Sequence, residues 1–188
     1  MHSSSKLKRL RLTKCYSITR FDLIHALERL PHLETLDLCY SSYNAEDIEV
    51  IGRICPQLKS FKMKTRFMGC EGDAYAIASS MPTLSHLQLF GSSVTDDGLY
   101  AILHGCPHLE SLDVRRCFDL NLGGNLGNFC RERIKDIKFT PPRNLLEDHD
   151  EFYGFSDSDS DDSYEDYEFP AGNAVFSEDD IDYYRLRD

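Results

Sequence analysis

One short pattern, apolar-x-x-apolar-x-apolar, recurs along this chain of 188 residues at a nearly constant spacing. A clear copy is Leu33-Glu-Thr-Leu36-Asp-Leu38, and successive copies follow one another every 25 or 26 residues. A proline stands two residues before four of the copies. The six copies begin at Leu7, Leu33, Leu58, Leu84, Leu109 and Ile134. A fixed period of this length predicts an architecture in which every copy is the same structural unit.

Each copy predicts a short β-strand whose apolar residues all lie on one face, because alternate residues of a strand point to opposite sides. Such a strand cannot bury its apolar face alone, so we expect neighbouring copies to pair in parallel and stack their side chains into one core. Between the strands the apolar spacing is helical. The expected inward faces carry Phe21, Ile24 and Leu27, then Ile48, Ile51 and Ile54, then Ala74, Ile77, Ala78 and Met81, then Leu99, Ile102 and Leu103.

Asn44 and Thr95, each followed directly by acidic residues or by alanine and acids, predict helix N-termini. The combined pattern predicts an α/β solenoid, shaped as a horseshoe, with parallel strands on the concave side and helices on the convex side. Residues 1–143 form this repeat domain in the prediction, and residues 144–188 form a separate tail.

The repeats resemble leucine-rich repeats of the cysteine-containing subtype. The resemblance rests on the repeat length, on Cys55-Pro56 and Cys106-Pro107 before two strands, and on Cys15 and Cys117 three residues after the last apolar strand residue. This subtype is typical of F-box/LRR proteins. The run from Phe129 to Asp136 resembles plant F-box/LRR-repeat proteins in particular.

In that family the repeats present a protein substrate to a ubiquitin ligase. The resemblance therefore implies a protein-interaction module with no catalytic activity of its own, the substrate-recognition part of an SCF-type E3 ligase in ubiquitin-dependent degradation. The F-box, which binds a Skp-type adaptor of a cullin complex, normally precedes the repeats, and no such segment precedes Leu7. A Skp-type adaptor and a cullin are thus expected partners only of a longer form, and the chain is expected to be a fragment, a truncated product or a relative without adaptor binding.

An alternative is an adaptor that binds basic proteins such as histones and has no link to ubiquitination. It would resemble the acidic leucine-rich nuclear phosphoproteins, whose repeats are shorter and carry Asn where this chain has Cys15 or Cys117.

The polar residues between the inward leucines should point out of the concave side and form the surface that holds a protein partner. This surface mixes charges with an aromatic side chain, and arginine and aromatic residues are the usual anchors of protein interfaces. Cys39 belongs to the same outward rows in this prediction. The expected contact residues are Arg11, Asp37, Lys62, Lys64, Gln88, Phe90, Asp113 and Arg115.

The acidity of the chain, a net charge of −11, lies almost wholly in its last 42 residues. Residues 1–146 hold 19 basic and 16 acidic side chains, whereas residues 147–188 hold 2 and 16. A like-charged, low-complexity segment cannot bury enough apolar surface to offset its ordering entropy, so the tail is predicted to be disordered. Its serines with an acid three residues later suit an acidophilic kinase, and the alternative is a purely solubilising tail. These candidate phosphorylation sites are Ser156, Ser158, Ser163 and Ser177.

Several classes of protein are excluded by the same sequence. The sequence has no apolar run long enough for a membrane span and no secretory leader at its start. The charge balance argues against a duplex nucleic-acid partner. The seven cysteines form no CxxC pair and indicate the reducing cytoplasm or nucleus. The run His104-Gly-Cys106-Pro-His108 contains residue types that bind metals. However, Cys106 occupies the same place in its repeat as Cys55, which has no flanking histidines, so we predict a packed cysteine there and no metal ligand. We predict no catalytic residues, no metal and no cofactor.

Overall fold

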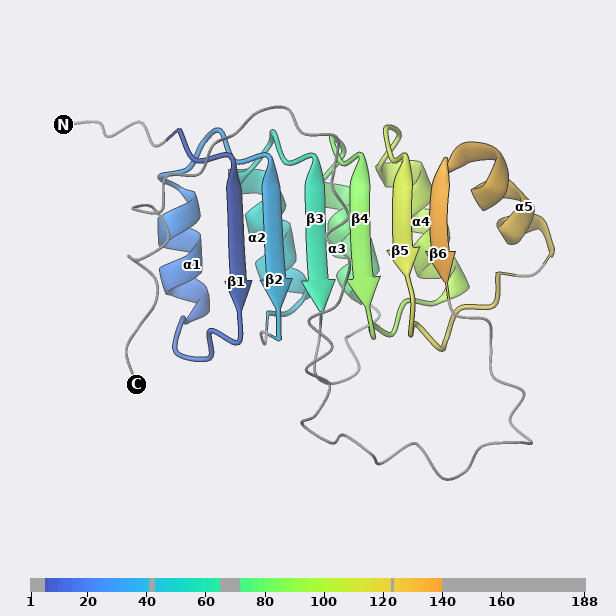
Figure 1. The fold of residues 1–188 in the computed structure, drawn as a ribbon, viewed down its shortest axis with the longest axis horizontal. Helices are drawn as coiled ribbons and strands as arrows, with labels where there is room; N and C mark the ends of the chain where they lie inside the picture. Colours follow the sequence, from blue (N-terminus) through green and yellow to red (C-terminus); the bar gives the residue numbers. More distant parts are fainter. Residues whose placement is uncertain (1–5, 41–42, 65–71, 123, 140–188) are drawn as a thin grey trace, which may run out of the picture. The chain divides into compact units, whose positions relative to one another are not determined.

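The computed structural model describes residues 6–40, 43–64, 72–122 and 124–139, in which strands and helices alternate (Figure 1). The elements are β1 (Arg9–Thr13), α1 (Arg20–Leu27), β2 (Thr35–Cys39), α2 (Ala45–Ile54), β3 (Ser60–Lys64), α3 (Gly72–Ser80), β4 (His86–Phe90), α4 (Asp96–Gly105), β5 (Ser111–Val114), α5 (Gly124–Arg133) and β6 (Asp136–Phe139). The predicted tail and the predicted boundary at residue 143 lie outside the described residues. Among the described residues, no helix has the length and apolarity needed to cross a membrane.

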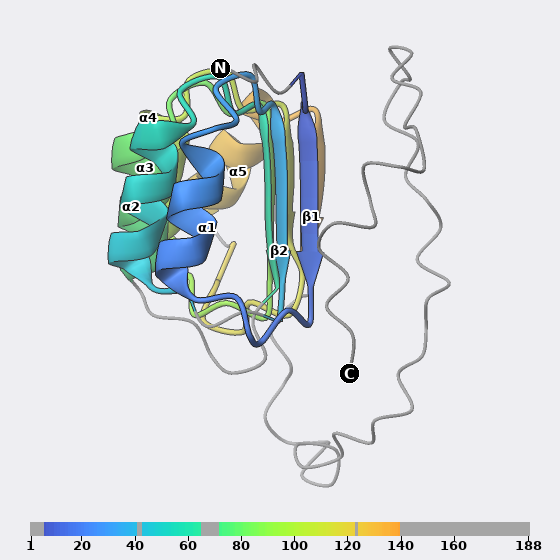
Figure 2. The ribbon, with the colours of Figure 1, turned by 90° about the vertical axis from the view of Figure 1, so that its left-hand side faces the viewer.

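The described strands form one parallel sheet in chain order, β1 to β6. Figure 2 shows the helices as a second layer against one face of this sheet. The opposite face carries no helix from the described part of the chain, and we call it the open face. The prediction of a parallel α/β solenoid is confirmed.

The strands pair without any shift in register, so each repeat places its apolar residues directly beside those of its neighbours. Leu36 lies opposite Leu10 on β1 and Phe61 on β3, and Leu38 lies opposite Met63. Leu36, Leu38 and Phe61 are fully buried or nearly so. Replacing one such leucine by alanine typically costs about 2–5 kcal/mol, so these rows dominate the stability of the fold.

The helix starts follow local capping chemistry. The Asn44 side chain accepts a hydrogen bond from the Asp47 amide, and the Asp47 carboxylate accepts one from the Asn44 amide, which forms a capping box. Thr95 caps α4 in the same position, with its hydroxyl accepting from the Gly98 amide at 3.2 Å. Both predicted N-termini are confirmed.

The predicted inward face of α1 was wrong in part. Phe21 is 70% exposed, and the buried residues of this helix are Leu23 and Leu27. The Thr19–Asp22 capping box determines where the helix begins, and from that start the i, i+4 pair Leu23–Leu27 faces the sheet. The sequence pattern of threes selected a neighbouring stripe because it took no account of that start.

The last strand also departs from the pattern. Phe139 occupies an inward position in the predicted repeat but is 40% exposed, and Ile137 is only half-buried. Within the described residues β6 has a neighbour on one side only, so its apolar side chains lack half of the packing that β2 to β5 receive. End repeats of solenoids commonly differ from inner ones for this reason.

Glycine allows the helices to approach closely. A Cβ on Gly105 of α4 would overlap the backbone carbonyl of Ala78 on α3, and one on Gly52 of α2 would overlap Ser80 at the end of α3. The contact at Gly105 is with backbone, which cannot move aside as a side chain can.

We therefore expect Gly105→Ala to lower the free energy of unfolding by about 1–3 kcal/mol, measured by chemical denaturation. Alanine ordinarily stabilises a helix by about 1 kcal/mol relative to glycine, so the clash must outweigh that gain. Asn125→Ala, an exposed change on α5, should stay within about 0.5 kcal/mol of the parent. A neutral or stabilised Gly105→Ala protein would contradict this packing.

Charged side chains link three repeats near the amino ends of the strands. Glu34 lies between Lys8 and Lys59, with carboxylate oxygens 2.9 and 3.2 Å from the two ammonium nitrogens. A hydrogen bond from Lys8, and to a smaller extent one from Lys59, holds the pKa of Glu34 below its ordinary value of 4.5.

A carboxyl with a lowered pKa in the folded state stabilises the protein above its unfolded pKa and loses that contribution as the pH falls through the folded value. Glu34→Gln should therefore reduce the loss of stability below about pH 4.5, measured by denaturation at several pH values. The exposed Glu28, changed to Gln, is the matched control. An unchanged pH profile for Glu34→Gln would show that the bridge does not form.

Candidate functional site

The register of the sheet arranges the outward side chains of the open face into rows that cross all the strands. The row through the strand centres, which we call the middle row, reads Arg11, Asp37, Lys62, Gln88, Asp113 and Lys138. The row near the carboxyl ends, which we call the end row, contains Thr13, Cys39, Lys64 and Phe90. The eight predicted contact residues thus come together on one surface, with Arg115 following β5.

In the first half of the middle row an arginine covers an aspartate. Arg11 Nε donates to Asp37 Oδ2 at 2.9 Å, and the side chain of Arg11 is 64% exposed whereas that of Asp37 is 9% exposed. Asp37 was predicted as an outward contact, but its carboxylate lies beneath the guanidinium. Its role in this geometry is to orient Arg11 toward solvent.

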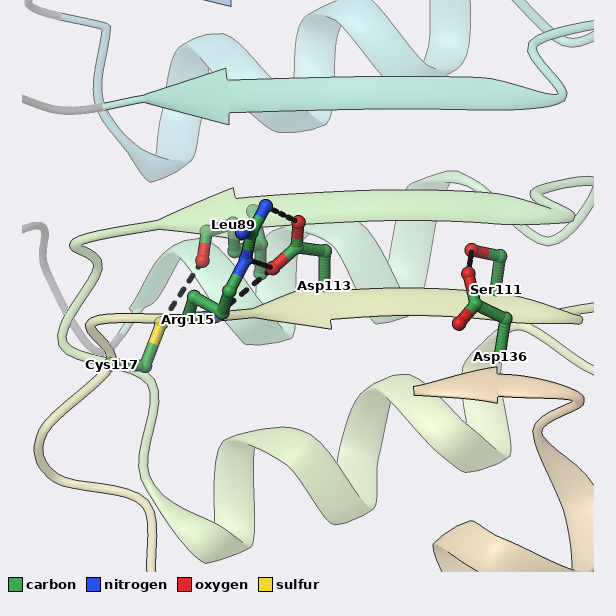
Figure 3. Close-up of polar contacts among 6 residues, drawn as sticks. All are labelled: Leu89, Ser111, Asp113, Arg115, Cys117 and Asp136. Carbon is green, nitrogen blue, oxygen red and sulfur yellow. Dashed lines mark hydrogen bonds and ion pairs between the residues drawn. The ribbon is translucent and has the colours of Figure 1, made fainter. Parts of the chain in front are cut away.

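A second pair occurs near the other end of the row (Figure 3). Arg115 Nε and Nη2 donate to the two carboxylate oxygens of Asp113 at 2.9 and 2.7 Å, and the Arg115 amide donates to Oδ1 at 3.2 Å. This two-pronged geometry is the strong form of an arginine–carboxylate pair. It fixes the guanidinium on the open face, with Lys62 and Gln88 between the two ion pairs.

Cations and aromatic rings alternate along the carboxyl ends of the strands. Lys64 Nζ lies 4.8 Å from the centroid of the Tyr40 ring and 4.7 Å from that of Phe90. Lys14 Nζ lies 5.9 Å from Tyr40, and the guanidinium carbon of Arg116 lies 5.6 Å from Phe90. We call Lys14, Tyr40, Lys64, Phe90 and Arg116 the cation–aromatic ladder. It extends over five repeats.

Three members of this ladder have left-handed backbone. The φ angles are 55° at Lys14, 59° at Tyr40 and 60° at Arg116, and Gly91 has 70° at the equivalent place in its repeat. All four lie seven residues after the first apolar residue of their repeat. The left-handed region costs a residue with a Cβ about 1–2 kcal/mol, so three large side chains occupy positions that suit glycine better.

Hydrogen bonds between repeats hold this left-handed turn in place. The Lys14 amide donates to the Cys39 carbonyl at 3.0 Å, and the Tyr40 amide donates to the Lys64 carbonyl at 2.7 Å. The expected contact residues do not include Lys14, Tyr40 or Arg116, because each outward row is predicted to end with its strand, although Arg116 adds to the basic excess of this surface. Their shared place in the repeat was the available signal.

Cys39 was predicted to be exposed in the end row, and that prediction was wrong. Cys39 is only 8% exposed, and burial raises the pKa of its thiol. Its neighbours in the end row are more accessible than Cys39: Thr13 is exposed and Lys64 is half-buried.

The amino ends of the strands add polar groups to the open face, including His86 on β4 and Ser111 on β5. Burial lowers the pKa of His86 below its ordinary value of 6.5, so the ring is neutral at pH 7. Ser111 Oγ donates to Asp136 Oδ2 at 3.4 Å (Figure 3). The positive charge of the open face at neutral pH therefore comes from its lysines and arginines.

The His104–His108 segment lies on the helical side. The His104 ring stacks against Phe129 at a centroid distance of 5.8 Å and lies tilted against Tyr100 at 4.1 Å. Cys106 is buried, its thiol donates to the Met81 carbonyl at 3.4 Å, and burial raises its pKa to about 11. In the part of the chain that the structure describes, no cluster of three or more His, Cys, Asp or Glu side chains has metal-binding geometry.

Other cysteines are also packing residues. Cys117 donates to the Leu89 carbonyl at 3.0 Å (Figure 3), and burial raises the pKa values of Cys55 and Cys117 to about 11. The described cysteines are free thiols. Their place in the core accounts for their recurrence at matching positions of the repeats.

Short parallel strands, one per repeat of 25 or 26 residues and alternating with helices along the described chain, define a leucine-rich-repeat protein. The sequence model of the family described as "Leucine Rich repeat" matches residues 80–103. Putative F-box/LRR-repeat proteins 22 and 23 of Arabidopsis thaliana are both 46% identical, over 84% and 72% of this chain. F-box protein SKIP19 of the same plant is 41% identical over 88% of the chain.

Over its repeat region, the chain belongs to the plant family of F-box/LRR-repeat proteins. The matched region covers 51% of protein 22, 31% of protein 23 and 58% of SKIP19. The chain therefore spans about a third to just over half of the length of these relatives. The candidate phosphorylation sites Ser156, Ser158, Ser163 and Ser177 lie outside the described residues.

The buried thiols make a direct prediction about reactivity. A thiol alkylating reagent at pH 8 should label the half-exposed Cys15 in the native protein and leave Cys55, Cys106 and Cys117 unlabelled until denaturant is added. Peptide mass spectrometry would measure this. Rapid labelling of Cys106 in the native state would contradict a packing role for the His104–His108 segment.

Proposed function

We propose that this chain is a non-enzymatic recognition module that holds a protein substrate on its open face for an SCF-type ubiquitin ligase. The chemistry of ubiquitin transfer would belong to partner subunits. The observation that carries the proposal is the open face itself, where ion pairs orient Arg11 and Arg115 and a ladder of cations and rings runs along one edge. Fixed arginine and aromatic side chains lose little conformational entropy when a partner binds.

The relatives support the ligase part of the proposal, because their names include the F-box, the segment that docks a Skp-type adaptor. The adaptor and the cullin are proposed as partners of any form of this protein that carries such a segment. We place the protein in the cytoplasm or nucleus, where its buried thiols stay reduced.

The second candidate is an adaptor that binds basic proteins such as histones through the acidic residues 147–188. Its specific support is the charge of that segment, with 16 acidic and 2 basic residues. The positive charge of the open face opposes a basic partner there, so the two candidates place their partners on different parts of the chain.

A photo-crosslinking side chain at Gln88 tests the open face in cells that naturally make the protein. We expect Gln88 to capture a protein that the same group at Glu49, on α2 at the helical side, does not capture. Immunoprecipitation of the endogenous protein should also recover a Skp-type adaptor, and turnover of the captured protein should slow when Lys62 and Lys64 are changed to Glu.

Equal capture from Gln88 and Glu49 would show that the open face is not the specific binding surface. Salt-sensitive histone binding that requires residues 147–188, with no Skp-type adaptor recovered, would favour the second candidate.

A further inference from the structure

We propose that the cation–aromatic ladder is a docking strip for an extended acidic peptide with carboxylates at every third residue. The inference deepens the proposed function by naming the class of segment that the open face takes. The acidic segment would belong to the bound protein and would cross the strands along their carboxyl ends.

The ladder supplies three positive charges in fixed places. Lys14, Lys64 and Arg116 each lie within 6 Å of a ring centroid, and Lys64 lies between two rings. A lysine held between Tyr40 and Phe90 cannot sample its usual rotamers freely. The Lys64 side chain therefore loses little further conformational entropy when a carboxylate binds it. These three cationic side chains give the ladder a positive charge, which complements an acidic segment.

The left-handed backbone is a second, independent observation. Lys14, Tyr40 and Arg116 adopt φ angles near 60°, which favour glycine. The equivalent residue of the fourth repeat is a glycine, Gly91, which has no side chain to contribute to the ladder. Unfavourable backbone that carries a large side chain is characteristic of functional surfaces. Here the same turn in different repeats directs cations and rings along one edge of the sheet.

The spacing of the strands defines the peptide. The three cations come from the first, third and fifth repeats, and adjacent strands lie about 4.8 Å apart, so successive cations follow strands separated by about 10 Å. A polyproline II peptide has three residues per turn and rises about 3.1 Å per residue, so it presents every third side chain on one face about 9 Å apart. A β-strand would turn every third side chain to the opposite face. The match is therefore to acid-x-x-acid-x-x-acid in an extended, polyproline-like conformation.

The test uses the full chain and two synthetic peptides of about ten residues, both rich in proline and serine and both with three glutamates. One peptide has a glutamate at every third position and the other has them adjacent. Fluorescence anisotropy should show at least about fivefold tighter binding of the spaced peptide, since each surface ion pair contributes up to about that factor. Equal affinity for the two peptides would overturn the proposal.

The double change Lys14→Gly with Arg116→Gly removes two cations at positions where the backbone suits glycine, so thermal stability should be kept or raised. We expect this variant to bind the spaced peptide at least about fivefold more weakly. The charge-matched control, Arg29→Ala with Arg53→Ala, changes exposed arginines near the ends of α1 and α2 and should keep the parent affinity. An equal loss in the control would reduce the effect to net charge and overturn the proposal.

Lys64→Met keeps the straight side chain between the two rings and removes its charge. The spaced peptide should again bind more weakly, and unchanged binding would overturn the central place of Lys64. These outcomes are separate from the test of the proposed function, because capture from Gln88 would still stand if the partner used the middle row without an acidic segment.

Discussion

The unshifted parallel register between neighbouring strands is the constraint on which the rest of the structure depends. Because Leu36 lies directly beside Leu10 and Phe61, each strand of five or fewer residues buries its apolar side chains against the next one. A slip of one residue would turn every leucine to the open face. The helices and the glycine contacts at Gly52 and Gly105 complete a core that no single repeat could form.

The same register organises the open face. Residues 25 or 26 apart in sequence become neighbours about 4.8 Å apart, so a charge in one repeat meets its partner in the next, as Arg11 meets Asp37. The outward rows therefore combine single side chains from many repeats into a surface. That surface is positive at neutral pH because its lysines and arginines outnumber its aspartates, and His86, being neutral, adds no charge.

Much of the fold was predictable from the sequence, since a 25–26 residue period with a fixed apolar motif leaves few arrangements that bury every leucine. The rows of the open face followed from the alternation of side chains along a strand, and the helix starts at Asn44 and Thr95 followed from capping chemistry. The predictions that failed have two different causes. Phe21 is exposed because a local capping box sets where α1 begins, and Phe139 is exposed where β6, within the described residues, has only one neighbouring strand.

The sequence by itself determined the period, the parallel pairing and the outward residues of the strands, because these depend on local periodicity repeated many times. Only the tertiary structure decided that Asp37 lies beneath Arg11, that Cys39 is covered, and that Tyr40 and Phe90 hold Lys64 between them. The place of Tyr40 depends on the left-handed backbone at that residue, and all of these arrangements depend on contacts between repeats. The physical reason is that a side chain's surroundings are set by residues 25 or more positions away, which pattern reading within one repeat does not contain.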